Sequence, residues 1–261
     1  MRKLLEIKDF SIELKKDNKT IVKNLNFDLD TGSSLILLGE SGSGKTLTCK
    51  SILGVLNAGF VKTGKILFQG GDLSNRKLYG KEIAMIAQNP MTAFDPSSRI
   101  GRHMDETLRI HMKLNRSERY TKCVMALNQA GLSNADTVMR SYPYMLSGGM
   151  LQRVMIAIAL MMDSQLIIAD EPTTALDVQH RNSTIDSFIR LRKDGAAILL
   201  VTHDFMAAIR FGGTILIMKD GEIIERGLVT NIIDKPQHPY TKELILASRL
   251  SDSEREDHKH A

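Results

Sequence analysis

The chain has 261 residues, of which 43% are hydrophobic and 25% are charged, a composition typical of a folded globular protein and not of a disordered one. The 35 basic and 30 acidic residues leave a formal net charge of +5, and the basic residues are scattered, so charge alone predicts no partner. The longest apolar run, residues 154–162, is too short to span a bilayer, no signal peptide is recognised, and two cysteines fit a reducing, cytosolic compartment.

Short runs of β-type sequence dominate the N-terminal part of the chain and return after residue 165. A glycine-rich loop follows the run at 34–38, and a helical pattern extends from Thr46 to about residue 56. Between residues 91 and 162 no convincing strand is present, and the helical spacing of three and four dominates. The predicted strands are 4–7, 10–14, 21–29, 34–38, 65–68, 83–87, 166–169, 197–202, 215–219 and 222–225.

Strands that alternate with helices predict an α/β fold with a parallel sheet covered on both faces. We therefore expect one domain, residues 1–250, in which a core formed by 1–90 and 163–250 is interrupted by a helical subdomain at about 91–162. Residues 251–261 are highly charged and predict a mobile tail.

The loop after the strand at 34–38 matches the pattern G-x-x-x-x-G-K-[ST], with the required strand before it and helix after it. Glycines allow backbone N–H groups to converge on phosphate oxygens, and the N-terminus of the helix adds partial positive charge. Lys45 would contact the β- and γ-phosphates, and the Thr46 hydroxyl would bind Mg²⁺. The predicted phosphate-binding residues are Gly39, Glu40, Ser41, Gly42, Ser43, Gly44, Lys45 and Thr46.

A second apolar strand, residues 166–169, leads directly into Asp170 and Glu171. Because successive residues of a strand point to opposite sides, the two carboxylates should have different roles. Asp170 fits a position that holds Mg²⁺ through water, and Glu171 can polarise the water that attacks the γ-phosphate. In a chain with a phosphate-binding loop, these residues predict hydrolysis of a nucleoside triphosphate with Mg²⁺ as the metal.

Residues 146–153, Leu-Ser-Gly-Gly-Met-Leu-Gln-Arg, resemble the signature motif of the ATP-binding cassette (ABC) ATPases. Ser147, Gly148 and Gly149 open a helix and so form a second anion-binding N-terminus. The resemblance implies a head-to-tail dimer in which each signature loop caps the ATP held by the partner chain. Met150 stands where glutamine is usual, whereas the serine and both glycines are retained.

Three further residues match functional elements of this family. Gln88 matches the Q-loop glutamine, which reaches Mg²⁺ and the attacking water and links the core to the helical insert. Asp177 matches the D-loop at the dimer seam, and His203 matches the switch histidine, which contacts the γ-phosphate and positions Glu171. The implied fold is that of a P-loop NTPase with a RecA-like core, an N-terminal antiparallel β subdomain and an inserted helical subdomain.

One feature of the family is missing from the N-terminal strands. An aromatic residue usually stacks on adenine there, but Leu14 occupies about that position, with Phe10 nearby. Since leucine stacks on adenine more weakly than an aromatic face, we expect modest nucleotide affinity for the isolated chain.

Two segments resemble the oligopeptide, dipeptide and nickel importer ATPases: Gln-Asn-Pro-Met-Thr-Ala-Phe-Asp-Pro at 88–96 and Pro-Gln-His-Pro-Tyr-Thr at 236–241. Residues 142–153 look more like the nickel or metal-chelate importers, particularly the first of their two ATPases. Many peptide-importer ATPases continue past the His-Pro-Tyr-Thr segment with a cysteine-bearing extension, and this sequence has no cysteine there. Nickel, cobalt or a metal chelate is therefore preferred as the transported solute.

The resemblance implies a peripheral subunit at the cytoplasmic face of the membrane. Its expected partners are a second ATPase, two integral-membrane permeases and an extracytoplasmic solute-binding protein, and not nucleic acid. A heterodimer of ATPases is expected, with a homodimer as the alternative. Two other functions remain open: a peptide-importer ATPase, and a soluble ABC ATPase that acts in assembly or repair. A regulatory cassette without turnover is disfavoured because Glu171 and His203 are both present.

Overall fold

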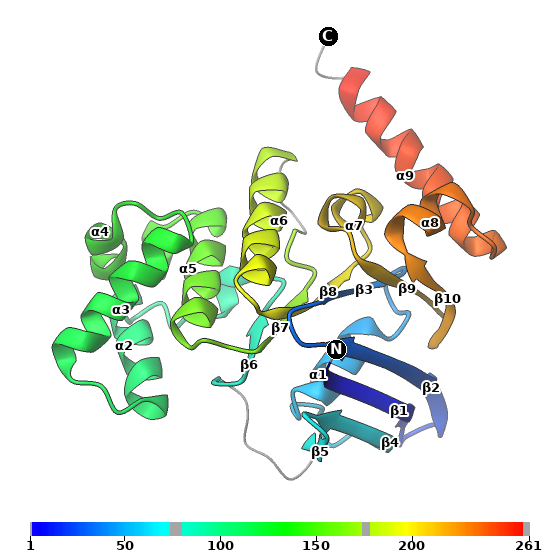
Figure 1. Cartoon of the computed structure of the whole chain (residues 1–261), viewed down its shortest axis with the longest axis horizontal. Coiled ribbons are helices and arrows are strands. Elements are labelled where there is room, and N and C mark those ends of the chain that lie inside the picture. The colour runs from blue at the N-terminus through cyan, green and yellow to red at the C-terminus, as the bar shows by residue number, and fades with distance from the viewer. Residues whose placement is uncertain (1, 74–79, 174–177, 258–261) are drawn as a thin grey trace. The chain divides into compact units, whose positions relative to one another are not determined.

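The computed structural model of the chain describes residues 2–73, 80–173 and 178–257 (Figure 1). It contains two compact units, each formed by residues that contact one another more than they contact the rest of the chain. Unit 1 consists of residues 1–75 and 199–261, and unit 2 consists of residues 76–198.

Unit 1 contains an antiparallel sheet with the strand order β2-β1-β4-β5. The two short strands predicted at 4–7 and 10–14 are one strand, because the chain bulges between them and Asp9 adopts a left-handed conformation with φ of 48°. The predicted antiparallel β subdomain is confirmed. Its strands are β1 (Lys3–Leu14), β2 (Lys19–Asp30), β4 (Phe60–Phe68) and β5 (Gly71–Asp72).

The second sheet of unit 1 has the strand order β10-β9-β3-β8. β3 runs parallel to β9 and antiparallel β10 forms the edge, so the parallel sheet predicted from the alternating pattern is confirmed. Every residue of β3 and β8 is buried, as expected for strands covered on both faces. The strands are β3 (Ser34–Leu38), β8 (Ala197–Thr202, of which 199–202 belong to unit 1), β9 (Thr214–Lys219) and β10 (Glu222–Leu228).

Two helices of unit 1 differ in length from the prediction. α1 ends at Ile52 instead of residue 56, because Gly54 takes up the left-handed conformation that commonly ends a helix. α9 continues to Asp257, so the first seven residues of the predicted tail are helical, whereas 258–261 lie outside the described residues. The helices are α1 (Lys45–Ile52), α7 (Phe205–Phe211), α8 (Val229–Asp234) and α9 (Pro239–Asp257).

Unit 2 pairs two parallel strands, β6 (Ile83–Ile86) and β7 (Leu166–Asp170), and its other described elements, apart from the first two residues of β8, are helices. The described residues between 91 and 162 contain helices and no strand, as predicted. Asn115 and Glu118 form a reciprocal capping box that fixes the start of α3. The helices are α2 (Ile100–His111), α3 (Arg116–Gln129), α4 (Ala135–Arg140), α5 (Gly148–Met161) and α6 (Val178–Lys193), with short 3₁₀ helices η2 (Pro90–Thr92) and η3 (Pro143–Met145).

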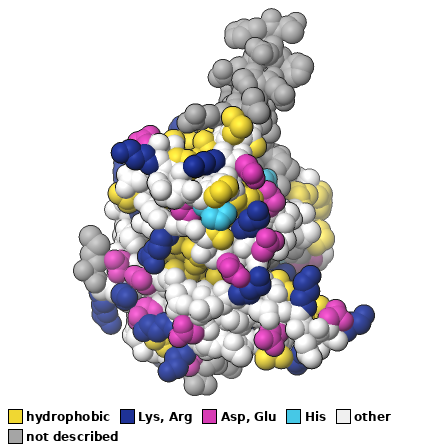
Figure 2. All heavy atoms as spheres, turned by 90° about the vertical axis from the view of Figure 1, so that its right-hand side faces the viewer, with side chains coloured by type: hydrophobic (Ala, Val, Ile, Leu, Met, Phe, Trp, Pro, Cys, Tyr) yellow, Lys and Arg dark blue, Asp and Glu magenta, His cyan; other side chains and the backbone are white. Residues whose placement is uncertain are grey.

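The distribution of surface charge and the state of the two cysteines are consistent with the composition. On the face shown in Figure 2, Lys and Arg side chains are interspersed with Asp and Glu. Cys49 and Cys123 are both buried free thiols, and burial raises the pKa of Cys123 to about 11, so that this thiol stays protonated at neutral pH. None of the described helices combines the length and the apolar character needed to cross a bilayer.

Gly64, the one glycine of β4, should be hard to replace. Its φ is +82°, and a Cβ there would lie 2.3 Å from the carbonyl oxygen of Asp9 in the bulge of β1. Gly64→Ala should lower the free energy of unfolding by roughly 2 to 5 kcal/mol, from left-handed strain and the steric clash together. Urea unfolding followed by circular dichroism measures the loss.

Gly70→Ala is the matched control for this prediction. Gly70 has a similar φ of +77°, but a Cβ there would meet no atom within 4 Å. In this variant the free energy of unfolding should fall by only the cost of the left-handed backbone, about 1 to 2 kcal/mol. Equal losses in the two variants would show that the close approach of β1 and β4 is unimportant.

Candidate ATP-binding and hydrolysis site

The predicted phosphate-binding loop connects β3 to α1 in unit 1. Its last glycine, Gly44, has a φ of 104° and forms the N-cap of α1, and Gly42 has a φ of 85°. Both conformations are accessible to glycine at little cost, and they turn the chain sharply into the helix. The loop thus presents the N-terminal end of α1, where N–H groups and the helix dipole favour phosphate.

Two glycines of the loop are required by close packing. A Cβ on Gly39 would lie 2.1 Å from the carbonyl oxygen of Met218 in β9. A Cβ on Gly44 would lie 2.8 Å from a methyl group of Val22 and 2.9 Å from the end of the Met218 side chain. β2 and β9 therefore pack closely against the loop at these two glycines.

Lys45 lies inside the curve of the loop with only 5% of its surface exposed. Its Nζ donates hydrogen bonds to the carbonyl oxygens of Gly39 at 2.7 Å and Glu40 at 2.8 Å. A buried ammonium needs such partners because desolvation is otherwise costly. The loop therefore holds a positive charge at the helix N-terminus, which is the charge that a phosphate group requires.

The rim of the loop remains open. Glu40, Ser41, Gly42 and Thr46 are exposed, whereas Ser43, Gly44 and Lys45 are buried. Thr46 is exposed in the first turn of α1. The buried Lys45 ammonium and the exposed residues around it fit a phosphate chain that carries Mg²⁺.

His203 follows the neighbouring strand β8. Asp204 accepts a hydrogen bond from Ala207 N at 3.0 Å and caps α7, while its own N–H donates to the hydroxyl of Thr202 at 2.9 Å. The N–H of Gly39 donates to the carbonyl oxygen of Thr202. The structure therefore brings His203 to the end of β8 that borders the first residue of the phosphate-binding loop.

Asp170 and Glu171 lie at the carboxyl end of β7 in unit 2, and both are buried, with 4% and 8% of their surface exposed. Glu171 has a φ of 51°, a conformation that few non-glycine residues adopt. In the parallel pair, Ile86 of β6 lies opposite Ala169 of β7. Gln88, which is exposed, and Glu171 therefore follow strands that end at the same edge.

The predicted signature residues begin α5 in the same unit. The Ser147 hydroxyl accepts a hydrogen bond from the N–H of Met150 at 3.3 Å and so caps the helix. Ser147 is exposed and both following glycines are partly exposed, so this helix N-terminus is open to an anion. Asp177, the predicted D-loop residue, lies outside the described residues.

Comparison with known proteins decides the family. The family described as "ABC transporter" matches residues 22–174. The chain belongs to this family. It is 39% identical over 249 residues to the metal-staphylopine import system ATP-binding protein CntD of Staphylococcus aureus strain Mu50, covering 93% of this chain and 92% of that protein.

Two further likenesses support the assignment. The dipeptide transport ATP-binding protein DppD of Lactococcus lactis subsp. cremoris is 38% identical over 264 residues, which cover 96% of this chain and 75% of that protein. The dimeric ATP-binding cassette MJ0796, in a post-hydrolysis state with ADP and Pi, superposes with a TM-score of 0.74 at 25% identity and covers 87% of this chain and 99% of that structure. The predictions of an ABC ATPase fold, of ATP hydrolysis and of ATP with Mg²⁺ are confirmed.

Two contacts that the sequence did not predict hold the phosphate-binding loop of this ABC ATPase. The hydroxyl of Tyr240 accepts a hydrogen bond from the N–H of Glu40 at 3.2 Å, and the N–H of Gly221 donates to the carbonyl oxygen of Ser43 at 3.2 Å. In the sequence, Tyr240 is notable only as part of the His-Pro-Tyr-Thr segment. That segment indicates a family, but it does not predict a contact with the loop.

The N-terminal strands add one observation about adenine. Phe10 is fully buried and is therefore not available for stacking on a nucleotide. Leu14 is paired across β1 and β4 with Phe60, which is only partly buried. Since directly opposed residues of an antiparallel pair share one face of the sheet, an aromatic side chain does stand beside Leu14, in the first half of β4, which the sequence pattern missed.

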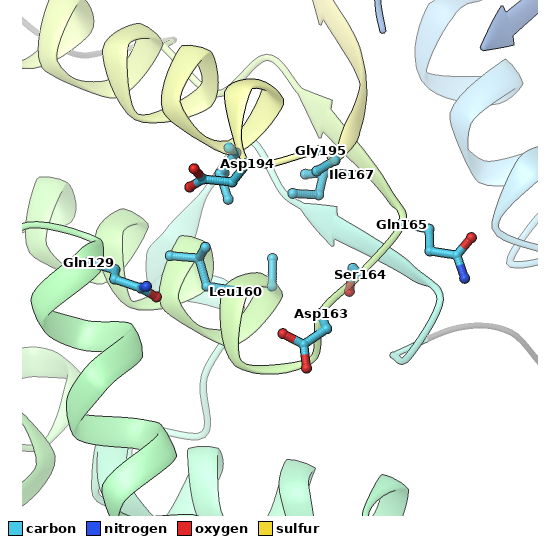
Figure 3. A pocket seen from close by; sticks show the side chains of 11 residues that line it. Gln129, Leu160, Asp163, Ser164, Gln165, Ile167, Asp194 and Gly195 are labelled. Atoms are coloured by element: carbon cyan, nitrogen blue, oxygen red, sulfur yellow. The ribbon is translucent and has the colours of Figure 1, made fainter. Parts of the chain in front are cut away.

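The cavity shown in Figure 3 lies elsewhere in unit 2. It has a volume of about 330 Å³ and is lined by the ends of α3, α5 and α6, by the loops that follow α5 and α6, and by Ile167 of β7. Asp170 ends the same strand, roughly 10 Å further along at the usual rise per residue. This cavity is therefore distinct from the carboxylates of Asp170 and Glu171.

Gln152 should stabilise the segment that carries Glu171. Its side chain is buried, and its Nε2 donates a hydrogen bond to the carbonyl oxygen of Pro172. Gln152→Met keeps the length of the side chain but leaves that buried carbonyl unpaired, so the free energy of unfolding should fall by about 1 to 3 kcal/mol in urea titrations. Gln129→Met, at an exposed position of α3, should change it by no more than about 0.5 kcal/mol. Equal stability of the two variants would contradict the role of this bond.

Proposed function

We propose that the chain is the ATP-hydrolysing subunit of an importer that takes up nickel, cobalt or a metal chelate. The observation that carries ATP use is the buried Lys45 ammonium inside the loop that begins α1. Support for a metal-chelate cargo comes from residues 142–153 and from the likeness to a metal-staphylopine import ATPase.

In this proposal the residues of unit 1 bind the phosphate chain. Lys45 and the N–H groups at the start of α1 neutralise the β- and γ-phosphates, and the Thr46 hydroxyl binds Mg²⁺. Mg²⁺ supplies charge neutralisation on the transferring phosphate. Phe60 and Leu14 together offer a surface for adenine.

The residues of unit 2 and His203 act on the water and the γ-phosphate. Glu171 accepts the proton of the attacking water, and Asp170 and Gln88 hold the hydrated metal. The left-handed backbone at Glu171 is a strained conformation of the kind found at functional sites. His203 contacts the γ-phosphate from the end of β8.

Ser147, Gly148 and Gly149 form the surface that caps ATP bound to a partner ATPase, and Asp177 belongs to the seam between the two chains. The open N-terminus of α5 supports this assignment, because it offers N–H groups to an anion outside its own chain. A heterodimer of ATPases, two permeases and an extracytoplasmic binding protein complete the proposed complex at the cytoplasmic face of the membrane.

Peptide import is the second candidate. The likeness to a dipeptide transport ATPase, at 38% identity over 96% of the chain, favours it directly. ATP-binding subunits in this arrangement do not contact the cargo, so the ATP site is the same for both candidates and the distinction requires an uptake measurement.

Glu171→Gln removes the proposed base and keeps the size of the side chain. In the assembled complex kcat for ATP hydrolysis should fall by at least about 100-fold, while ATP still binds and the dimer stays closed. Phosphate release and size-exclusion chromatography with ATP measure the two effects. Glu222→Gln, at an exposed ion pair with Lys23, should keep the parental rate. Hydrolysis by Glu171→Gln at the parental rate would remove Glu171 from this role.

Metal content of cells that lack the gene tests the proposed cargo. Cells grown in metal-poor medium should lose nickel or cobalt, measured by elemental analysis, and regain it with the parental chain. Complementation with Lys45→Ala should fail, because the phosphate chain loses its buried counter-charge. Unchanged metal in all strains would reject metal uptake and favour peptides.

A further inference from the structure

One peptide unit of the phosphate-binding loop is held at both of its ends. The carbonyl oxygen of Gly39 accepts a hydrogen bond from Lys45 Nζ at 2.7 Å. The N–H of the same peptide unit, which belongs to Glu40, donates to the hydroxyl of Tyr240 at 3.2 Å. Because a peptide unit is planar and rigid, fixing the direction of its N–H also fixes the direction of its carbonyl oxygen.

Tyr240 is well placed to act as a fixed support. It is 4% exposed, and Lys219 Nζ lies 4.5 Å from the centroid of its ring, within the range of a cation–π interaction. Its backbone N–H donates to Nδ1 of His238 at 3.1 Å. The phenol oxygen therefore has little freedom to follow a moving loop.

Glu225 anchors the segment that carries Tyr240 to β10. Its two carboxylate oxygens accept hydrogen bonds from the backbone N–H groups of Gln237 at 2.8 Å and His238 at 3.1 Å. The carboxylate thus joins the sheet of unit 1 to the start of α9, one turn before the tyrosine. All of these contacts lie within unit 1.

The phenol stays protonated at neutral pH. Burial raises the pKa of Tyr240, the backbone hydrogen bond from Glu40 lowers it, and the nearby Glu40 carboxylate raises it further. A neutral phenol keeps its oxygen as an acceptor for the loop N–H without adding a charge to the phosphate site.

We propose that Tyr240 is a positioning residue for ATP binding, acting through the Gly39–Glu40 peptide to hold the Lys45 ammonium where the phosphate chain meets it. The inference rests on the proposed phosphate-binding role of Lys45. It gives the His-Pro-Tyr-Thr segment a function in the nucleotide site: the start of α9 determines how tightly the loop binds ATP.

Tyr240→Phe tests this proposal, because it removes the phenol oxygen and keeps the buried ring. The Kd of the full-length chain for Mg-ATP, from competition with a fluorescent ATP analogue, should rise about threefold to tenfold, as expected for one lost hydrogen bond. In the assembled complex KM for ATP should rise by a similar factor with kcat nearly unchanged, since Lys45 would bind ground state and transition state alike. Tyr144→Phe, at a residue that is 65% exposed, should leave both values at the parental level.

The outcomes separate this inference from the proposed function. A lower melting temperature with an unchanged Kd in Tyr240→Phe would make the contact purely structural and overturn the inference. If Lys45→Ala loses ATP affinity and Tyr240→Phe does not, the phosphate role stands and the inference alone fails. If Lys45→Ala binds ATP like the parental chain, the phosphate role fails as well.

Glu225→Gln provides a second variant in case Tyr240→Phe does not fold. The amide keeps one acceptor oxygen, so the segment loses one of its two anchoring bonds and Tyr240 is held less firmly. The Kd for Mg-ATP should rise at least twofold without a change in kcat. An unchanged Kd in a folded Glu225→Gln chain would overturn the inference.

Discussion

The buried Lys45 ammonium, which donates to the carbonyl oxygens of Gly39 and Glu40, is the interaction on which the nucleotide-binding half of this ABC ATPase depends. A charge with so little solvent contact is tolerated only where backbone oxygens replace water, so the loop must curve around it. That curvature in turn requires the left-handed glycines and brings β9 within contact of Gly39. The loop is therefore shaped for phosphate by its own chain.

The two carboxylates proposed to act in hydrolysis, in unit 2, obey a different constraint. Asp170 and Glu171 end a strand with no exposed residue, and such a strand can present polar groups only where it leaves the sheet. The backbone turns abruptly there, through the left-handed Glu171, and the buried amide of Gln152 holds the next carbonyl. A hydrogen bond from α5 thus fixes the residue that follows Glu171.

Much of the fold could be predicted because its buried strands are short, continuous apolar runs. β3 and β8 match their predicted ranges, since burial on both faces excludes polar residues along their whole length. The first half of β4 was missed because residues 61–65 are exposed and carry no apolar alternation. The bulge at Asp9 was also missed, because it lies against Gly64 of another strand, which no pattern in the residues beside Asp9 indicates.

The sequence by itself determined which groups the candidate site contains: the glycines, lysine and threonine of the loop, the two carboxylates after an apolar strand, and the serine and glycines that open a helix. These patterns are readable because each group acts through its own neighbours in the chain. Only the tertiary structure decided what holds the groups in place. Tyr240 meets Glu40 across 200 positions and Gln152 meets Pro172 from another element. Such contacts arise from packing between elements, and no local spacing encodes them.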